Sequence, residues 1–250
     1  MKKRPLIFVG YRSKINELAW TADRLGHEVL GVLDHQFVDQ ASMCSLPILG
    51  DERTLADVND RRSQKWLADC DFFVGTAFFG SQQSADDPRN LERLRYQRIN
   101  LLDKIGAQVA NLIDPKTEIQ QRLRNQYCAD LKIGKGIYIS WNSDIQPLGV
   151  ALGDYCSLET GSFVGHGSVI GRNVSLMPFS LINRGIVGDN TCIGMQAKTS
   201  KPDHCYNIGK WSTVYYNAVI DQNVPANSVL LPGGIIKDKK RSLDWVNQSI

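Results

Sequence analysis

Residues 152–170 have the sequence LGDYCSLETGSFVGHGSVI, in which positions 152, 158, 164 and 170 are aliphatic. The sixfold spacing extends well beyond this stretch, to Ile133, Ile139, Ile145, Leu176, Val187, Ile193, Ile208, Val214 and Ile220. An α-helix repeats about every 3.6 residues and a half-buried strand about every two, so neither produces this period. The pattern indicates a hexapeptide repeat over the region from 133 to 220.

Glycine, asparagine and small residues recur at fixed places around the aliphatic positions. Glycine follows them at Gly134, Gly153, Gly165, Gly171, Gly188, Gly194 and Gly209. Two residues further on lie Gly136, Asn173, Asn190 and Asn223. All of these residues tolerate positive φ, so we expect them to mark corners. A small residue precedes the aliphatic position by two at Cys156, Ser162, Ser168, Thr191, Ala197, Ser212 and Ala218.

These regularities describe short parallel strands joined by tight corners. Such strands wind into a solenoid, in which each coil buries its apolar edge against the next coil. We therefore predict a left-handed parallel β-helix with three hexapeptides per coil. Positions 133, 152, 170, 187 and 208 should then stack on one another, about eighteen residues apart.

Two interruptions break the sixfold spacing. Extra residues occur at 146–149, which include Pro147, and a longer gap that includes Pro202 separates Thr199 from Ile208. We expect both segments to form loops that protrude from the β-helix. Loops on a regular scaffold often carry functional residues, so these two are candidates for a site.

Residues 1–115 have the pattern of a small α/β domain. Apolar runs at 6–10, 27–34, 71–78 and 108–113 predict strands. Helices are expected from Ser13 to Gly26, over a short polar segment at 54–60, and from Asp87-Pro88 to Gly106. The first strand, helix and strand form a βαβ unit, whose strand ends are suited to hold a ligand. We predict a Rossmann-like domain at 1–115, a connecting segment at 116–130, the β-helix at 131–232 and a tail at 233–250.

The composition excludes several classes of protein. The 250 residues are 42% hydrophobic with a formal charge of +3, and no basic stripe with interleaved aromatic residues points to nucleic acid. No apolar stretch is long enough to span a membrane, so we expect no membrane insertion. Metal or redox spacing is lacking among the cysteines, which are Cys44, Cys70, Cys128, Cys156, Cys192 and Cys205. We expect them to be reduced packing residues in a cytoplasmic protein without a metal site.

Several short motifs, taken together, resemble one known family. They are the βαβ unit, a Val-Leu-Asp strand end at Asp34, the segment Leu-Pro-Ile-Leu-Gly at 46–50, a strand ending in Ile113-Asp-Pro, the pair Gly165-His166, and Asn-Val-Pro-Ala-Asn-Ser-Val at 223–229. This set is similar to the bacterial nucleotide-sugar acyltransferases of the PglD/NeuD type, over almost the whole chain. The resemblance implies a homotrimer that transfers an acyl group, expected to be acetyl, from acyl-CoA to an amine or hydroxyl of a nucleotide-activated sugar.

The resemblance also implies catalytic roles. His166 lies at the position of the family's general base, and an imidazole can take a proton near neutral pH. A backbone N–H one coil later, at Arg184 or Gly185, is expected to stabilise the oxyanion. Where the family has an acidic residue to orient the histidine ring, this chain has Gly167. Glu159, which replaces an asparagine, either orients His166 from the preceding edge or is a solvated surface residue.

Ligand-binding positions are implied in both domains. In the N-terminal domain they are Gly10, Arg12, Lys14 and Asp34 for the nucleotide sugar. Only Gly10 remains of the family's glycine-rich loop, so Arg12 and Lys14 would bind phosphate by charge. For coenzyme A the candidates are Ser175, which replaces a histidine that borders the cofactor, and the basic residues Lys198, Lys201, Lys210 and Lys237.

Two other functions share this fold. One is a catalytically weakened relative that binds a nucleotide sugar or acts as a trimeric scaffold, and Gly167 and the altered glycine loop favour it. The other is a γ-class carbonic anhydrase, whose zinc needs three histidine ligands. The repeat region contains only His166 and His204, so we set the carbonic anhydrase aside.

Overall fold

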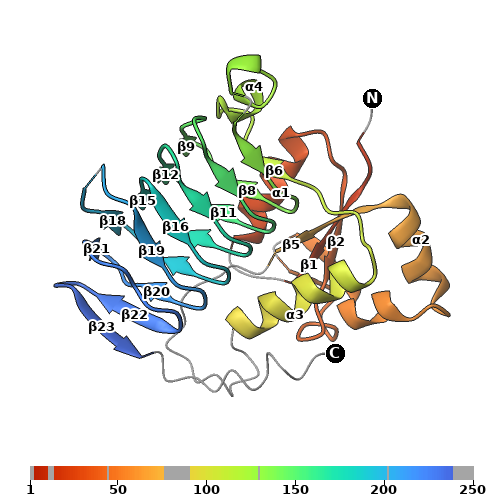
Figure 1. Ribbon diagram of the computed structural model, residues 1–250. Coiled ribbons are helices and arrows are strands. Elements are labelled where there is room, and N and C mark those ends of the chain that lie inside the picture. The colour runs from red at the N-terminus through yellow and green to blue at the C-terminus, as the bar shows by residue number, and fades with distance from the viewer. Residues whose placement is uncertain are drawn as a thin grey trace. The chain divides into compact units, whose positions relative to one another are not determined.

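The computed structural model describes residues 3–10, 14–43, 45–75, 91–128, 130–201 and 203–238. The described residues up to Leu112 form one compact unit, and those from Ile113 form a second (Figure 1). The expected connecting segment at 116–130 belongs to the second unit. It contains α4 (Ile119–Arg122) and the 3₁₀ helix η2 (Gln126–Cys128), and the Ile119 side chain is part of the apolar core of that unit.

The first unit contains a mostly parallel sheet. Its strand order is β3-β4-β2-β1-β5, with β1 (Leu6–Val9), β2 (Val29–Leu33), β4 (Leu46–Gly50) and β5 (Asp71–Val74) parallel and β3 (Ser42–Met43) antiparallel to β4. Helix α1 (Ile15–Arg24) connects β1 to β2, which confirms the βαβ unit. Strand β1 is buried throughout, as its uninterrupted apolar sequence requires.

The remaining helices of the first unit differ in part from the prediction. The segment expected to be one helix at 54–60 is the 3₁₀ helix η1 (Glu52–Ala56), and α2 (Arg61–Asp69) follows it. Asp51 and Asp60 begin these helices, because their carboxylates accept the N–H groups of Arg53 and Arg62. Helix α3 is described over Leu91–Lys104; the expected start at Asp87-Pro88 and the expected strand end beyond Gly75 lie outside the described residues. At 108–113 only a bridge from Val109 to Phe72 and the short β6 form.

The second unit is a coil with three parallel walls (Figure 1). The first wall contains β7 (Lys132–Ile133), β10 (Ala151–Leu152), β13 (Val169–Ile170), β16 (Gly185–Val187) and β19 (Tyr206–Ile208). The second contains β6 (Leu112–Ile113), β8 (Tyr138–Ile139), β11 (Ser157–Leu158), β14 (Ser175–Leu176), β17 (Cys192–Ile193), β20 (Thr213–Val214), β22 (Ser228–Leu231) and the antiparallel β23 (Ile235–Asp238). The third contains β9 (Asp144–Ile145), β12 (Phe163–Val164), β15 (Leu181–Ile182), β18 (Lys198–Thr199) and β21 (Val219–Ile220).

The predicted stacking of the coils is confirmed. On the first wall Leu152 pairs with both Ile133 and Ile170, and Val187 pairs with Ile170 and Ile208. The repeated parallel walls fit a left-handed β-helix. Its interior is filled by the aliphatic residues of the repeat, and the small residues that precede them by two positions are buried as well.

Glycine has a different role after the aliphatic positions than the one predicted. Gly153 is in an ordinary backbone conformation, but a Cβ there would lie 2.6 Å from the carbonyl carbon of Gly171 in the next coil. Lack of space, and not positive φ, therefore requires glycine at these positions. The expected positive φ does occur two residues later, at Asn173 and Asn190, but Asn223 lacks it.

The end of the described chain contains a hairpin that the sequence did not suggest. Strand β23 returns antiparallel to β22 through a turn in which Gly233 and Gly234 both have positive φ. Among the described residues, the five cysteines are all unbonded to one another, and Cys44 lies outside them. No helix in the described part of the chain is long and apolar enough to cross a membrane.

Candidate functional site

A cavity of about 380 Å³ lies at the corner of the coil between the third and first walls. Its lining residues are Leu148, Gly149, His166, Gly167, Arg184 and Cys205. Leu148 and Gly149 come from one expected loop, at 146–149, and Cys205 comes from the other. Both interruptions of the hexapeptide spacing therefore border the same cavity as His166.

His166 is held at this corner through its backbone. Its N–H donates to the side-chain oxygen of Gln146 at 3.1 Å, and its carbonyl accepts the N–H of Arg184 at 3.2 Å. The residue is exposed, and none of the described residues that line the cavity is a carboxylate. The ring can act as a proton acceptor towards a molecule in the cavity, but nothing in its lining fixes the ring by an ion pair.

The structure does not bring Glu159 into this cavity. Glu159 follows β11 at the corner between the second and third walls, whereas His166 follows β12 at the next corner. The Glu159 side chain is buried, and its backbone bonds to neighbouring coils through Leu176 and Ser143. Within one chain, the two residues predicted to act together are therefore on different edges of the coil.

The backbone N–H groups predicted to bind the oxyanion are both used within the coil. The N–H of Arg184 donates to the carbonyl of His166, and the N–H of Gly185 donates to the hydroxyl of Ser168 at 3.4 Å. Arg184 has a positive φ of 51° and lines the cavity. The oxyanion role stays a prediction, and the sequence reasoning did not use the cationic side chain that Arg184 adds to the residues of the lining.

The predicted cofactor residues lie on different faces of the second unit. Ser175 is buried on the second wall, with its hydroxyl 2.8 Å from that of Ser157. Lys198 is exposed on the third wall and Lys201 lies in the loop that carries Cys205, but neither lysine lines the cavity. Lys210 lies at the corner between the first and second walls, and Lys237 lies on β23.

In the first unit, three parallel strands bring their carboxyl ends together. The N–H of Gly10, after β1, donates to Leu33 of β2 at 2.8 Å. The N–H of Asp34, after β2, donates to Gly50 of β4 at 2.9 Å. Lys14 immediately precedes α1 and makes no capping bond through its side chain, while Arg12 lies outside the described residues. Such an edge is where open α/β sheets bind ligands.

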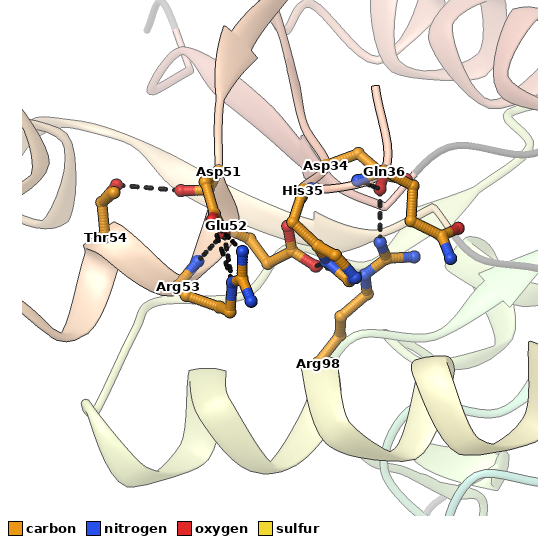
Figure 2. A network of polar contacts seen from close by, with 8 residues as sticks. All are labelled: Asp34, His35, Gln36, Asp51, Glu52, Arg53, Thr54 and Arg98. Carbon is orange, nitrogen blue, oxygen red and sulfur yellow. Dashed lines mark hydrogen bonds and ion pairs between the residues drawn. The ribbon is translucent and has the colours of Figure 1, made fainter. Parts of the chain in front are cut away.

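Asp34 belongs to a buried ion-paired network at this edge (Figure 2). Its Oδ1 lies 2.7 Å from an Arg98 terminal nitrogen, and both side chains are almost fully buried, at 0% and 2% exposure. Nε of the same Arg98 donates to Oε1 of Glu52 at 2.8 Å. Asp34 Oδ1 also accepts the N–H of Gln36 at 3.0 Å. Asp34, predicted to contact the nucleotide, is thus enclosed and paired with Arg98.

Glu52 is ionised by its partners. Burial by itself would raise the pKa of Glu52, but the Arg98 guanidinium and the bond from His35 outweigh that effect and lower the pKa below its ordinary value. Asp34, His35 and Glu52 form the one group among the described residues whose ligand atoms are spaced to hold a metal ion. The cation between their carboxylates is already supplied by Arg98.

A second cavity, of about 360 Å³, opens beside this network. Its lining residues are His35, Glu52, Arg53, Ala56, Leu94, Gln97, Arg98 and Leu101, from η1, α3 and the turn after β2. Sequence reasoning found Asp34 but missed His35, Glu52 and Arg98. Only one feature hinted at Arg98: it falls on the buried face of α3, four residues after Leu94 and three before Leu101.

The fold is shared with solved acetyltransferase structures. The acetyltransferase domain of PglB from Neisseria gonorrhoeae FA1090 matches 94% of this chain and 100% of its own, with 20% identity and a TM-score of 0.70. WeeI from Acinetobacter baumannii AYE matches 94% and 100%, with 16% identity and a TM-score of 0.62. A mutant of GDP-perosamine N-acetyl transferase from Caulobacter crescentus, in complex with CoA and GDP-perosamine, matches 93% and 96%, with 16% identity and a TM-score of 0.53.

No protein-family model matches the sequence, and no curated protein matches it. At identities of 20% or less, the solved structures show a common fold that extends over both units. The chemistry of this chain must therefore be argued from its own residues.

Proposed function

We propose that the protein transfers an acyl group, acetyl in the simplest case, from acyl-CoA to an amine or hydroxyl of a nucleotide-linked sugar. The observation that carries this proposal is the position of His166, which lines a cavity at a corner of the β-helix. The solved structures of this fold support it, because one is named an acetyltransferase domain and another was solved with CoA and GDP-perosamine.

His166 would act as the general base. The sugar nitrogen or oxygen attacks the thioester carbonyl carbon, and a ring nitrogen of His166 accepts the proton that the nucleophile loses. The carbon–sulfur bond then breaks, the acyl group stays on the sugar, and the thiolate leaves and is protonated as free coenzyme A. Arg184 lines the same cavity, and its guanidinium would stabilise the negative charge of the tetrahedral intermediate.

The first unit would serve as a Rossmann-like domain that holds the nucleotide. Its carboxyl edge brings Gly10 beside the end of β2, and Lys14 offers a cation at the start of α1. Lys198 on β18 and Lys201 in the loop that carries Cys205 precede a lining residue of the His166 cavity along the chain, so we assign the coenzyme A phosphates to them first.

We also propose that the protein is a cytoplasmic homotrimer. Val169 and Ile186 pair in register on the first wall, and both side chains are exposed to more than a third of their surface. Neighbouring apolar side chains of this kind support a contact with a second copy. Light scattering on the purified protein measures the mass directly, and a monomeric mass would contradict the trimer.

The test is acyl-CoA-dependent release of free thiol with a panel of nucleotide-linked aminosugars and sugars. We expect turnover with at least one acceptor, and a decrease in kcat of about 10²–10⁴-fold in His166→Ala, the range for loss of a general base. Lys135→Ala, an exposed residue at another corner, is the control and should retain activity.

Two results would count against this proposal. Unchanged kcat in His166→Ala would remove His166 from the mechanism. Nucleotide-sugar binding without turnover on any acceptor would favour the second candidate, a catalytically weakened relative that binds a nucleotide sugar. That candidate is supported by one observation, the lack of a described carboxylate in the lining of the His166 cavity.

A further inference from the structure

The His35 ring is fixed by Glu52. Oε2 of Glu52 accepts the backbone N–H of His35 at 2.6 Å, and Oε1 lies 2.8 Å from the ring nitrogen Nδ1 (Figure 2). An ionised carboxylate has no proton to donate, so Nδ1 must carry the hydrogen of this bond. In the neutral ring Nε2 therefore has a lone pair, and it is an acceptor on the edge of the ring turned away from Glu52.

The cavity beside His35 combines an apolar wall with a few polar groups. Ala56, Leu94 and Leu101 supply aliphatic surface, and Gln97 supplies a carboxamide, with an NH₂ donor and a carbonyl acceptor. A volume of about 360 Å³ is at the lower end of the range for ligand sites. This lining suits a flat, largely apolar molecule with hydrogen-bonding groups on one edge.

The charges next to the cavity disfavour a phosphate there. Asp34 and Glu52 are two carboxylates that share one buried guanidinium, that of Arg98. Arg53, the other arginine in the lining, pairs with Asp51. The network therefore has an excess of negative charge, which repels an anion. A neutral heterocycle meets no such penalty.

The cavity is also in reach of the edge where a phosphate would bind. Gly10 follows β1, and the lining residues His35 and Glu52 follow the next two strands of the sheet, β2 and β4. Adjacent strands are about 4.8 Å apart, so the ends of β2 and β4 lie about 5–10 Å from the end of β1. A ribose with its phosphates bridges such a span.

We propose that this cavity binds the base of the nucleotide, and that His35 selects bases with a ring N–H. Uracil, thymine and guanine have such a group, which would donate to Nε2 of His35, with Gln97 bonding the adjacent carbonyl. Adenine and cytosine have no ring N–H on their Watson–Crick edge. This inference rests on the proposed function, since it concerns the nucleotide part of that substrate.

The test is calorimetric titration of the full chain with uridine, guanosine, cytidine and adenosine diphosphates, without any acyl donor. The uridine or the guanosine nucleotide should bind about tenfold or more tightly than the adenosine and cytidine nucleotides, the effect of one well-made hydrogen bond to a partly buried acceptor. Equal affinity for all four would overturn the inference.

Two substitutions at His35 separate the two nitrogens. His35→Asn keeps a donor near the place of Nδ1, for Glu52, but has no atom near Nε2. It should fold and lose the base preference, so that the affinities differ by about twofold or less. His35→Gln keeps an acceptor near the place of Nε2 and should retain part of the preference. A full preference in His35→Asn would contradict the role of Nε2.

Gln97→Ala provides a second test that leaves the ion-paired network intact. It should reduce the base preference, whereas the matched control Gln64→Ala, an exposed glutamine on α2 outside the cavity, should not. If His35→Asn fails to fold, an unchanged preference in Gln97→Ala overturns the inference. Acyl transfer without a His35-dependent base preference would contradict this inference alone. A base preference without acyl transfer would contradict only the proposed function.

Discussion

The two cavities hold a histidine in opposite ways. His35 in the first unit is bonded through its ring to Glu52, which is itself ion-paired with Arg98 in the buried interior. His166 in the second unit is held through its backbone, at an exposed corner between two loops. A ring fixed by buried charges is pre-oriented for recognition, whereas a ring at an exposed corner is oriented only by what binds beside it.

Because of this difference, we expect substitutions around His35 and around His166 to have different effects on stability and activity. The groups that orient His35 are part of the interior of the first unit, so changing them should affect folding as well as binding. The groups around His166 are peripheral to the core of the coil, so changing them should affect chemistry alone. Each prediction below tests one side of this contrast.

The largest effect is expected for Arg98→Met. The substitution leaves the buried carboxylates of Asp34 and Glu52 without their shared cation, which should lower the free energy of unfolding by about 3–5 kcal/mol. Chemical denaturation followed by circular dichroism measures this change.

The control for Arg98 is Arg53→Ala. The Arg53 side chain is 70% exposed where it pairs with Asp51, and exposed ion pairs contribute about 0–1 kcal/mol. Similar losses in the two variants would show that burial of the network does not determine its contribution.

A smaller loss is expected for Gly153→Ala in the second unit. The added Cβ would lie 2.6 Å from the backbone of Gly171 in the next coil, and overpacking of this kind costs about 1–3 kcal/mol. Gly26→Ala is the matched control, because a Cβ there has nothing within 4 Å and only its φ of +82° is unfavourable, which costs about 1 kcal/mol. If Gly26→Ala is the more harmful, conformation and not space governs the glycines of this chain.

The first unit should lose stability in acid through Glu52. The folded-state pKa of Glu52 is below the ordinary value of 4.5, so its contribution is complete above that pH and is lost as the pH falls through the lower, folded pKa. One such proton changes the free energy of unfolding by at most about 1.4 kcal/mol per pH unit. Unfolding measured between about pH 6 and 3 should show a shallower decline in Glu52→Gln than in the unmodified chain. Parallel declines would mean that Glu52 contributes nothing to this dependence.

The smallest stability change is expected for His166→Ala. The side chain is exposed and its backbone bonds survive the substitution, so the free energy of unfolding should change by less than about 0.5 kcal/mol. Thermal unfolding of the same preparation used for kinetics would check this. A large destabilisation would show that lost activity in this variant reports on folding and not on proton transfer.

The β-helix was predictable because its sixfold spacing can be read from consecutive residues. Not every turn of the repeat was assigned correctly. Ile182 is a core residue of β15 that was left out of the predicted series, although it follows Leu176 by six positions; the irregular step is the one of five positions from Ile182 to Val187. Helix α2 was missed because its apolar residues, Trp66, Leu67 and Ala68, are consecutive and form no stripe at helical spacing. The two loops were expected from broken spacing alone, but their meeting at one cavity was visible only in the fold.

For the first unit the sequence supplied strands, a βαβ unit and Asp34 as a residue of interest. The ion pair of Asp34 with Arg98 was not predictable, because Arg98 lies sixty-four positions further along the chain. Glu52 and His35 are ordinary polar residues in sequence. Nothing in their spacing shows that they share a proton-bearing bond beside a cavity.

The sequence by itself determined the coil, because each hexapeptide places the same kinds of residue against the same neighbours. The repetition allows the coil to be predicted without knowledge of tertiary contacts. Only the tertiary structure decided which polar groups act together. It separated Glu159 from His166 by a corner of the coil and joined His35, Glu52 and Arg98 from three segments. Side chains distant in sequence meet through packing, and burial then fixes which of them are charged and which atoms are left to face a ligand.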